Sequence, residues 1–273
     1  MASLPDELLD VVARGVRVFD LGRELFNGMP QSPNHPRFWM ALQRRHGDVV
    51  RPDGGSAASE TITTGGHVGT HIDALSHVSH HDKLYGGIPA AEALRGGRFA
   101  TLGIETVEPM VCRGVLLDLP RALGVDALDP GYEVTPDDLD AACELGGSRP
   151  VPGDVVLLRT GWAKRWDDPE AYVGRATGVP GPAEEGAKWI AASGARAAGA
   201  DTLAFERIAP HEGHAVLPAH RVLLVEHGIH IIETLALEEL AASGVREFTF
   251  VLSPLKIVGG TGSPVRPLAV VAA

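Results

Sequence analysis

The stretch from Thr64 to His81, T-G-G-H-V-G-T-H-I-D-A-L-S-H-V-S-H-H, constrains the fold of this chain more than any other. Glycines at positions 65, 66 and 69 are interleaved with β-branched residues at positions 68, 70 and 72. Both residue types disfavour the interior of a helix. We therefore predict an extended strand end or loop here, in which residues two apart point to the same face.

This stretch carries four potential metal ligands, His67, His71, Asp73 and His77, at spacings of four, two and four. Imidazole and carboxylate groups are the ligands that Zn²⁺ and Mn²⁺ take. In an extended segment they can converge, with Gly69 leaving room for a bound group. A solvated histidine-rich loop is the alternative. A run punctuated by glycine contributes almost no apolar area to a core, so we favour the metal site.

Two further candidate ligands lie near the C-terminal end. Residues Pro218–His227 are predicted to form a helix with His220 in its first turn, and Glu233 follows the apolar pair Ile231-Ile232 in a predicted strand. Burying a carboxylate is costly unless it is paired or bound to a metal. Glu233 is therefore a candidate ligand, and a strand-end glutamate in a salt bridge is the alternative.

Apolar runs of strand length alternate with helical patterns in the middle of the chain. Gly114–Leu119 and Asp154–Thr160 are predicted strands, Ala183–Ser193 is a predicted helix, and Thr135 is the expected cap of another. This alternation is typical of an α/β fold. With 273 residues and 44% hydrophobic content, we expect one domain spanning residues 1–273.

Charge and termini narrow the range of partners. The 24 basic and 35 acidic side chains give a net charge of −11, which disfavours nucleic acid and anionic membranes and favours a small-molecule substrate. The N-terminus lacks the basic start and apolar run of a signal peptide, so we expect a cytoplasmic protein. Cys112 and Cys143 lack C-x-x-C spacing, which disfavours a disulfide framework or a thiolate metal site.

The segment His67–His77 resembles the H-x-G-T-H-x-D-x-P-x-H signature of a cyclase family that includes bacterial kynurenine formamidases and isatin hydrolases. Leu75 stands where that family usually has proline. Further family-like patterns follow in the expected order: M-P-x-x-P at 29–33, L-P-x-H-R-x-L-L at 217–224, I-x-I-x-E-x-L at 229–235 and G-x-x-G-S-P-x-R-x-x-A at 259–269. The resemblance covers nearly the whole chain. It implies an α/β fold of the swivelling β/β/α sandwich type, assembled as a homodimer or homotetramer.

The same resemblance implies roles for particular residues. His77 is expected to be the catalytic proton shuttle, and Asp201 is expected to orient a histidine. One or two Mn²⁺ or Zn²⁺ ions are expected, with Asp73 or Glu233 bridging in the two-ion case. The expected ligands are His67, His71, Asp73, His220 and Glu233.

A proline-rich predicted loop, Asn27–Pro36, borders the substrate site in the resembled family and leads here into two aromatic residues. Simple core packing is the alternative for these aromatic side chains. A serine-hydrolase site at Ser76 is disfavoured because the chain has no G-x-S-x-G elbow. The candidate residues of the substrate pocket are Phe38, Trp39, Tyr85, Phe205, His211 and His214.

These observations predict a metal-dependent hydrolase of a small amide or lactam, acting on C–N bonds other than peptide bonds and similar to a formamidase or an isatin hydrolase. A lactone hydrolase or a secondary-metabolite cyclase or dehydratase, using the same metal site, is the alternative within enzymes. A metal-binding protein without catalysis is the alternative outside them. Retention of His77 and of an aromatic loop speaks against that last alternative, because metal storage needs neither.

Overall fold

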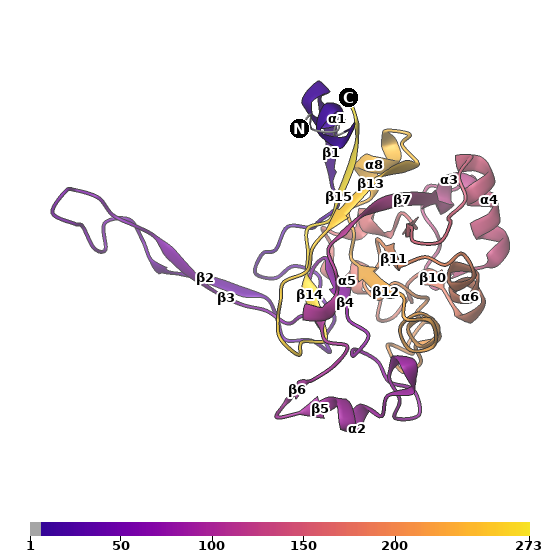
Figure 1. The fold of residues 1–273 in the computed structure, drawn as a ribbon, viewed down its shortest axis with the longest axis horizontal. Helices are drawn as coiled ribbons and strands as arrows, with labels where there is room; N and C mark the ends of the chain where they lie inside the picture. Colours follow the sequence, from indigo (N-terminus) through magenta and orange to yellow (C-terminus); the bar gives the residue numbers. More distant parts are fainter. Residues whose placement is uncertain (1–6) are drawn as a thin grey trace, which may run out of the picture.

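The computed structural model describes residues 7–273, and a nine-stranded mixed sheet runs through its body (Figure 1). The strand order is β1-β15-β13-β7-β9-β11-β12-β4-β14. The central strands β7, β9, β11 and β12 pair in parallel, and the flanking strands pair antiparallel. The bounds are β1 Val16–Asp20, β4 His71–Asp73, β7 Met110–Asp118, β9 Val155–Arg159, β11 Ala197–Ala200, β12 His230–Glu233, β13 Glu247–Leu252, β14 Gly262–Pro264 and β15 Leu268–Ala272.

The centre of the sheet is buried on both faces, as expected for parallel strands that read as continuous apolar runs. All five residues of β9 are buried. One core cluster packs the sheet against α4 (Pro136–Gly146), α6 (Glu184–Ala192) and η4 (Arg221–His227). A second cluster packs it against α8 (Glu238–Ala242) and includes residues of β1. The strands predicted at Gly114–Leu119 and Asp154–Thr160 are thus present as parts of β7 and β9.

Local capping signals are confirmed where they were strongest. Thr135 accepts a hydrogen bond from the backbone N–H of Asp138, and the Asp138 carboxylate accepts one from the backbone of Thr135. This reciprocal pair begins α4. The helix predicted at Pro218–His227 is instead a short α-helix, α7, followed by the π-helical η4.

The remaining elements are short, and every helix within residues 7–273 is too short or too polar to span a bilayer. Besides the nine-stranded sheet, pairs form between β5 and β6 and between β8 and β10. The bounds are α1 Glu7–Arg14, η1 Tyr85–Gly87, α2 Ala90–Ala93, β5 Leu94–Arg95, β6 Arg98–Phe99, η2 Ile104–Thr106, α3 Leu119–Leu123, β8 Glu133–Val134, η3 Trp162–Arg165, α5 Pro169–Val173, β10 Gly181–Pro182 and α7 Pro218–His220.

A hairpin arm, formed by β2 (Trp39–Arg44) and β3 (Ser59–Thr63), projects away from the body (Figure 1). Its strands pair only with each other. The side chains of Met40 and Ile62, which are cross-strand partners, are 41% and 56% exposed. No pattern in the sequence indicated β2, so the arm was not predicted.

Candidate metal centre

Strand β4 carries the histidine motif and lies between β12 and β14. The antiparallel register places His71 opposite Glu233 and Asp73 opposite Gly262. Close approach of these segments depends on glycine: a Cβ added at Gly262 would lie 2.5 Å from a carbon of the His67 ring. Gly69, with φ of +67°, supplies the left-handed turn that leads into β4. The expected extended segment is therefore present, and its glycines shape the site.

Two imidazoles and two carboxylates meet at the end of β12. The Nε2 atom of His71 lies 3.2 Å from Glu233 Oε2, and the Nε2 atom of His220 lies 3.3 Å from Glu233 Oε1. The same two nitrogens lie 3.6 and 3.7 Å from the two oxygens of Asp73. All four side chains are buried. The structure thus brings together ligands predicted from distant segments of the chain, and we call His71, Asp73, His220 and Glu233 the ligand cluster.

The two imidazoles are held by their outer nitrogens. His71 donates its Nδ1–H to the carbonyl of Gly69 at 2.8 Å, and His220 donates its Nδ1–H to Glu206 at 2.5 Å. The Nε2 atom of each ring is therefore the one that faces the carboxylates. Histidines that bind metals are oriented in this way by carbonyl or carboxylate acceptors. Glu206, which also accepts hydrogen bonds from the backbone N–H groups of Ala219 and His220, was not predicted from the sequence.

The prediction that Asp201 orients a histidine is wrong. Its carboxylate accepts hydrogen bonds from the backbone and hydroxyl of Thr160 and from the backbone N–H of Gly161. These bonds hold the turn after β9, and burial raises the pKa of the Asp201 carboxyl. Glu206 therefore has the role that the sequence analysis assigned to Asp201.

A second group shares Asp73 with the ligand cluster. His67 Nδ1 lies 2.7 Å from Asp73 Oδ1, and its Nε2 bonds the hydroxyl of Thr261 at 2.9 Å. The ring of His77 stacks on that of His67 with 3.8 Å between centroids. His67, Asp73 and His77 each offer one ligand atom within 4.8 Å of the others. Asp73 is therefore placed to serve either one ion or two.

The histidines and carboxylates of the ligand cluster stabilise each other's charged forms. Burial opposes the charge of His71, but its hydrogen bond to Glu233 and the charges of Glu233 and Asp73 outweigh this and raise its pKa to about 9. Burial likewise opposes the charge of His220, yet Glu206 and Glu233 hold its pKa well above the usual value. Burial would also raise the pKa of Glu233, but hydrogen bonds from His220 and His71 lower it. The cluster is thus a compensated set of charges.

His77 behaves differently from the imidazoles of the ligand cluster. Burial lowers its pKa to about 4 despite the nearby charge of Asp73. Its imidazole is therefore neutral at pH 7 and able to accept a proton.

One buried oxygen atom tests whether these residues fit a metal ion. Asp73 Oδ2 is buried and accepts no hydrogen bond from the described residues. An unsatisfied buried oxygen on a charged group is costly. A divalent cation among Asp73, Glu233 and the two Nε2 lone pairs would satisfy it, so the residues present fit a metal ion.

Three members of the ligand cluster, His71, His220 and Glu233, line a small cavity of about 40 Å³. The other lining residues are Ser32, His35, His67, His77, Leu203, Ala204, His214 and Leu217. Of the predicted pocket residues, only His214 lies here. Ser32 and His35, from the proline-rich loop, were not predicted. The signal that pointed to that loop was its composition, which does not identify the residues that turn inward.

The other predicted pocket residues lie elsewhere, because aromatic character alone does not distinguish a pocket wall from a core or a surface. Phe38 lines an adjoining cleft, and Trp39 lies on the arm, 47% exposed. Tyr85 packs against Gly228. Phe205 is fully buried in the core cluster of α4, α6 and η4, and His211 is exposed.

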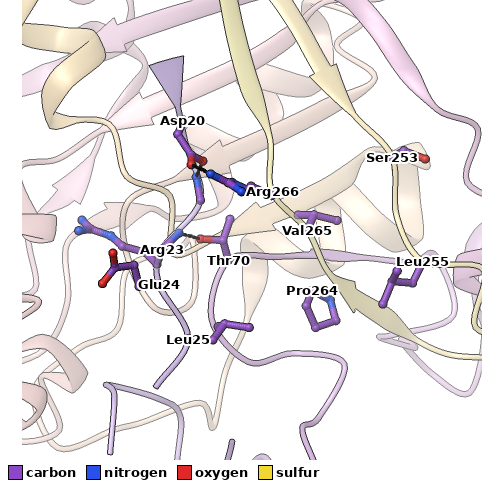
Figure 2. A pocket seen from close by; sticks show the side chains of 11 residues that line it. Asp20, Arg23, Glu24, Leu25, Thr70, Ser253, Leu255, Pro264, Val265 and Arg266 are labelled. Carbon is purple, nitrogen blue, oxygen red and sulfur yellow. Dashed lines mark hydrogen bonds and ion pairs between the residues drawn. The ribbon is translucent and has the colours of Figure 1, made fainter. Parts of the chain in front are cut away.

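A cavity of about 750 Å³ lies away from the ligand cluster (Figure 2). It lies along β14, and Thr70 is the motif residue that reaches it. Asp20 and Arg266 lie side by side on its wall and form an ion pair of 2.6 Å. Two of its charged groups therefore neutralise each other. Its volume alone does not make it the site of chemistry.

Oriented imidazoles that face buried carboxylates are typical of proteins that bind a divalent transition metal. The family model described as "Putative cyclase" matches residues 19–207, and the chain belongs to this cyclase family. An isatin hydrolase from Roseibium aggregatum is 26% identical over 223 residues, which cover 80% of this chain and 77% of the relative.

Two solved structures extend the comparison. One described as a novel cyclase superposes with a TM-score of 0.84 at 30% identity, covering 98% of this chain and 93% of the other. A structure described as a predicted metal-dependent hydrolase from Bacillus stearothermophilus superposes with a TM-score of 0.61 at 25% identity, covering 94% and 98%. The expected cyclase-type fold and the family resemblance are confirmed.

Proposed function

We propose that this chain is a metal-dependent hydrolase of a small amide or lactam. The observation that carries the proposal is the ligand cluster: two imidazoles whose Nε2 atoms are fixed in position face two buried carboxylates, one with an unsatisfied oxygen. The isatin hydrolase relative and the neighbour described as a metal-dependent hydrolase support hydrolysis. Histidine and carboxylate ligands favour Mn²⁺ or Zn²⁺ over Mg²⁺ or Ca²⁺.

A divalent ion at such a site lowers the pKa of bound water from 15.7 to about 7 and polarises a carbonyl oxygen. The residues of the chain do the rest. His71 and His220 keep their Nε2 atoms aimed inward because Gly69 and Glu206 accept their Nδ1 protons. Neutral His77, on the wall of the same cavity, takes a proton during attack and returns it to the leaving nitrogen.

The role of His77 depends on whether the site holds one ion or two. With one ion in the ligand cluster, His77 stays free to move protons. With two ions, Asp73 would be shared between them, and His67 and His77 would hold the second. Elemental analysis of the purified protein decides between one and two equivalents per chain.

A panel of formamides, lactams and lactones tests the proposal. The protein is treated with EDTA and then supplied with Mn²⁺ or Zn²⁺. We expect no turnover after chelation and restored turnover of amides or lactams with metal. Preference for lactones, or for elimination or ring closure, would support a lactone hydrolase or a cyclase or dehydratase instead. Stoichiometric metal without turnover of any substrate would support a non-catalytic metal-binding protein.

We also propose that the chain works as a cytoplasmic homodimer or homotetramer in which the hairpin arm contacts a second copy. A two-stranded ribbon is marginally stable alone in water. The arm nonetheless exposes a row of large apolar side chains that includes Met40, Leu42 and Ile62. Contact with another copy of the chain would cover them. Sedimentation analysis of the intact chain tests this expectation.

A further inference from the structure

The cavity at the ligand cluster is too small for a whole substrate. Its volume of about 40 Å³ is close to the roughly 30 Å³ that one molecule occupies in liquid water. If the proposed function holds, only the reacting carbonyl and a water fit inside. The body of the substrate must then occupy adjoining space.

Two clefts adjoin this cavity. One, of about 340 Å³, shares Ser32 and His35 with it, and we call it the proline-loop cleft. The other, of about 410 Å³, shares His214 and Leu217, and we call it the helix cleft because Pro218 and Arg221 line it. Both volumes fall within the range of small-ligand pockets. Volume alone does not choose between them.

Their charges do. Arg221 in the helix cleft forms ion pairs of 2.7 Å with Glu184 and 3.2 Å with Glu226, and Glu184 lines the same cleft. The positive charge of this cleft is therefore already matched. An added anion would meet a carboxylate beside the guanidinium.

In the proline-loop cleft the positive charge is not matched. Arg37 lines it and forms no ion pair with the described residues, and no acidic residue lines the cleft. Met29, Phe38 and Val173 supply apolar walls from the loop and from α5. The chain as a whole carries a net charge of −11 and repels anions. An unpaired arginine in a cleft without acidic residues therefore provides a local positive potential that attracts them.

We infer that the substrate carries a carboxylate, which Arg37 binds in the proline-loop cleft, while a ring-sized apolar body lies between Phe38 and Val173. The guanidinium presents a planar fork of donors that matches a carboxylate. The scissile carbonyl would extend past Ser32 and His35 to the ligand cluster. This substrate class rests on the proposed function, and Arg37 determines specificity without taking part in the chemistry.

The test compares two probes that differ only in a carboxylate, formanilide and 4-formamidobenzoate, on the metal-loaded protein. We expect the wild type to favour 4-formamidobenzoate in kcat/KM by about tenfold, as one exposed, charge-assisted pair allows. Arg37→Gln should remove this preference through KM, with kcat unchanged and formanilide unaffected. Arg95→Gln, an equal change of charge at an exposed residue that lines neither cleft, should keep it.

Calorimetric binding of the same probes separates this inference from the proposed function. Binding of 4-formamidobenzoate that weakens in Arg37→Gln, without any turnover, would uphold the cleft assignment and contradict the hydrolase. Equal binding of both probes to the wild type would overturn the inference. So would loss of the preference in Val216→Trp rather than Arg37→Gln, because Val216 lines the helix cleft.

Discussion

The hairpin arm and the histidine motif are consecutive in the chain, but different interactions hold them. The arm is held by pairing between its own strands, and its Leu42 and Ile62 are 55% and 56% exposed. The motif enters the sheet at β4, where Asp73 is fully buried. Substitutions should therefore be tolerated in the arm and costly in the ligand cluster. A contrast of this kind separates a surface used for contact from a site used for chemistry.

The largest effect is expected from Glu233→Ala. This change removes a carboxylate that lies 3.2 and 3.3 Å from two imidazole nitrogens. Metal content should fall to background and activity with it, because both His71 and His220 lose their shared partner. Elemental analysis and turnover are measured together. Full metal content and wild-type turnover in this variant would show that the cluster is not the metal site.

His77→Ala is expected to separate proton transfer from metal binding. The variant should keep its metal while kcat falls by roughly 10²–10⁴, the usual contribution of a positioned acid or base. Activated esters should lose less, because their leaving groups need less protonation. His81→Asn, at an exposed neighbouring histidine with φ of +48°, is the matched control. Loss of metal in parallel with activity would instead make His77 a ligand of a second ion.

Glu206→Gln should weaken metal binding by roughly 10- to 100-fold, because Glu206 fixes the ring of His220 from behind. Competition with a chelator of known affinity measures this. The exposed Glu212→Gln should leave affinity unchanged. An unchanged affinity in Glu206→Gln would mean that η4 and α7 position His220 without help from this carboxylate.

Metal affinity should rise with pH across neutrality. The pKa of His71 is raised to about 9 by Glu233 and Asp73 against the effect of burial, so below that pH its proton must leave before an ion binds. Each displaced proton adds about tenfold per pH unit. We expect the opposite trend for the stability of the metal-free protein. The contribution of protonated His71 is full below about pH 6.5 and is lost as pH rises through about 9. Calorimetric titration at pH 6, 7 and 8 checks the first trend, and a flat profile would contradict it.

The smallest effect on the fold is expected in the arm. The double variant Met40→Ser/Ile62→Ser should change the free energy of unfolding by no more than about 0.5 kcal/mol, because both side chains are exposed partners across the hairpin. Its assembly state should nevertheless fall in size-exclusion chromatography. The exposed Val125→Ser should change neither property. Unaltered assembly in the double variant would remove the arm from the contact between copies.

Local signals in the sequence predicted the elements whose causes are local. Thr135 and Pro136 indicated the start of α4, and the apolar run at Asp154 indicated β9, because capping and burial leave their mark on neighbouring residues. Glu233 stood out because a carboxylate after two isoleucines is costly unless it has a partner. Such signals need no knowledge of the rest of the chain.

Other features depend on contacts that neighbouring residues do not encode. Nothing in the local sequence F-E-R distinguishes Glu206 from a surface glutamate. Its burial and its hydrogen bond to His220 become visible only in the fold. The aromatic candidates failed for the same reason, because Tyr85 faces Gly228 and Trp39 faces solvent. Strand β2 of the arm was missed because it has no buried face, and so its sequence does not alternate between apolar and polar residues.

The hydroxyl of Thr70, the residue before His71, donates a hydrogen bond of 2.7 Å to the carbonyl of Thr234, the residue after Glu233, 164 residues away. Closing a loop of that length costs about 4–5 kcal/mol of chain entropy beyond a constant. During synthesis β4 therefore leaves the ribosome long before the strand that completes its site. A partly made chain can offer an ion His71 and Asp73 but not Glu233. The completed protein should therefore bind metal tightly, whereas the nascent chain should not.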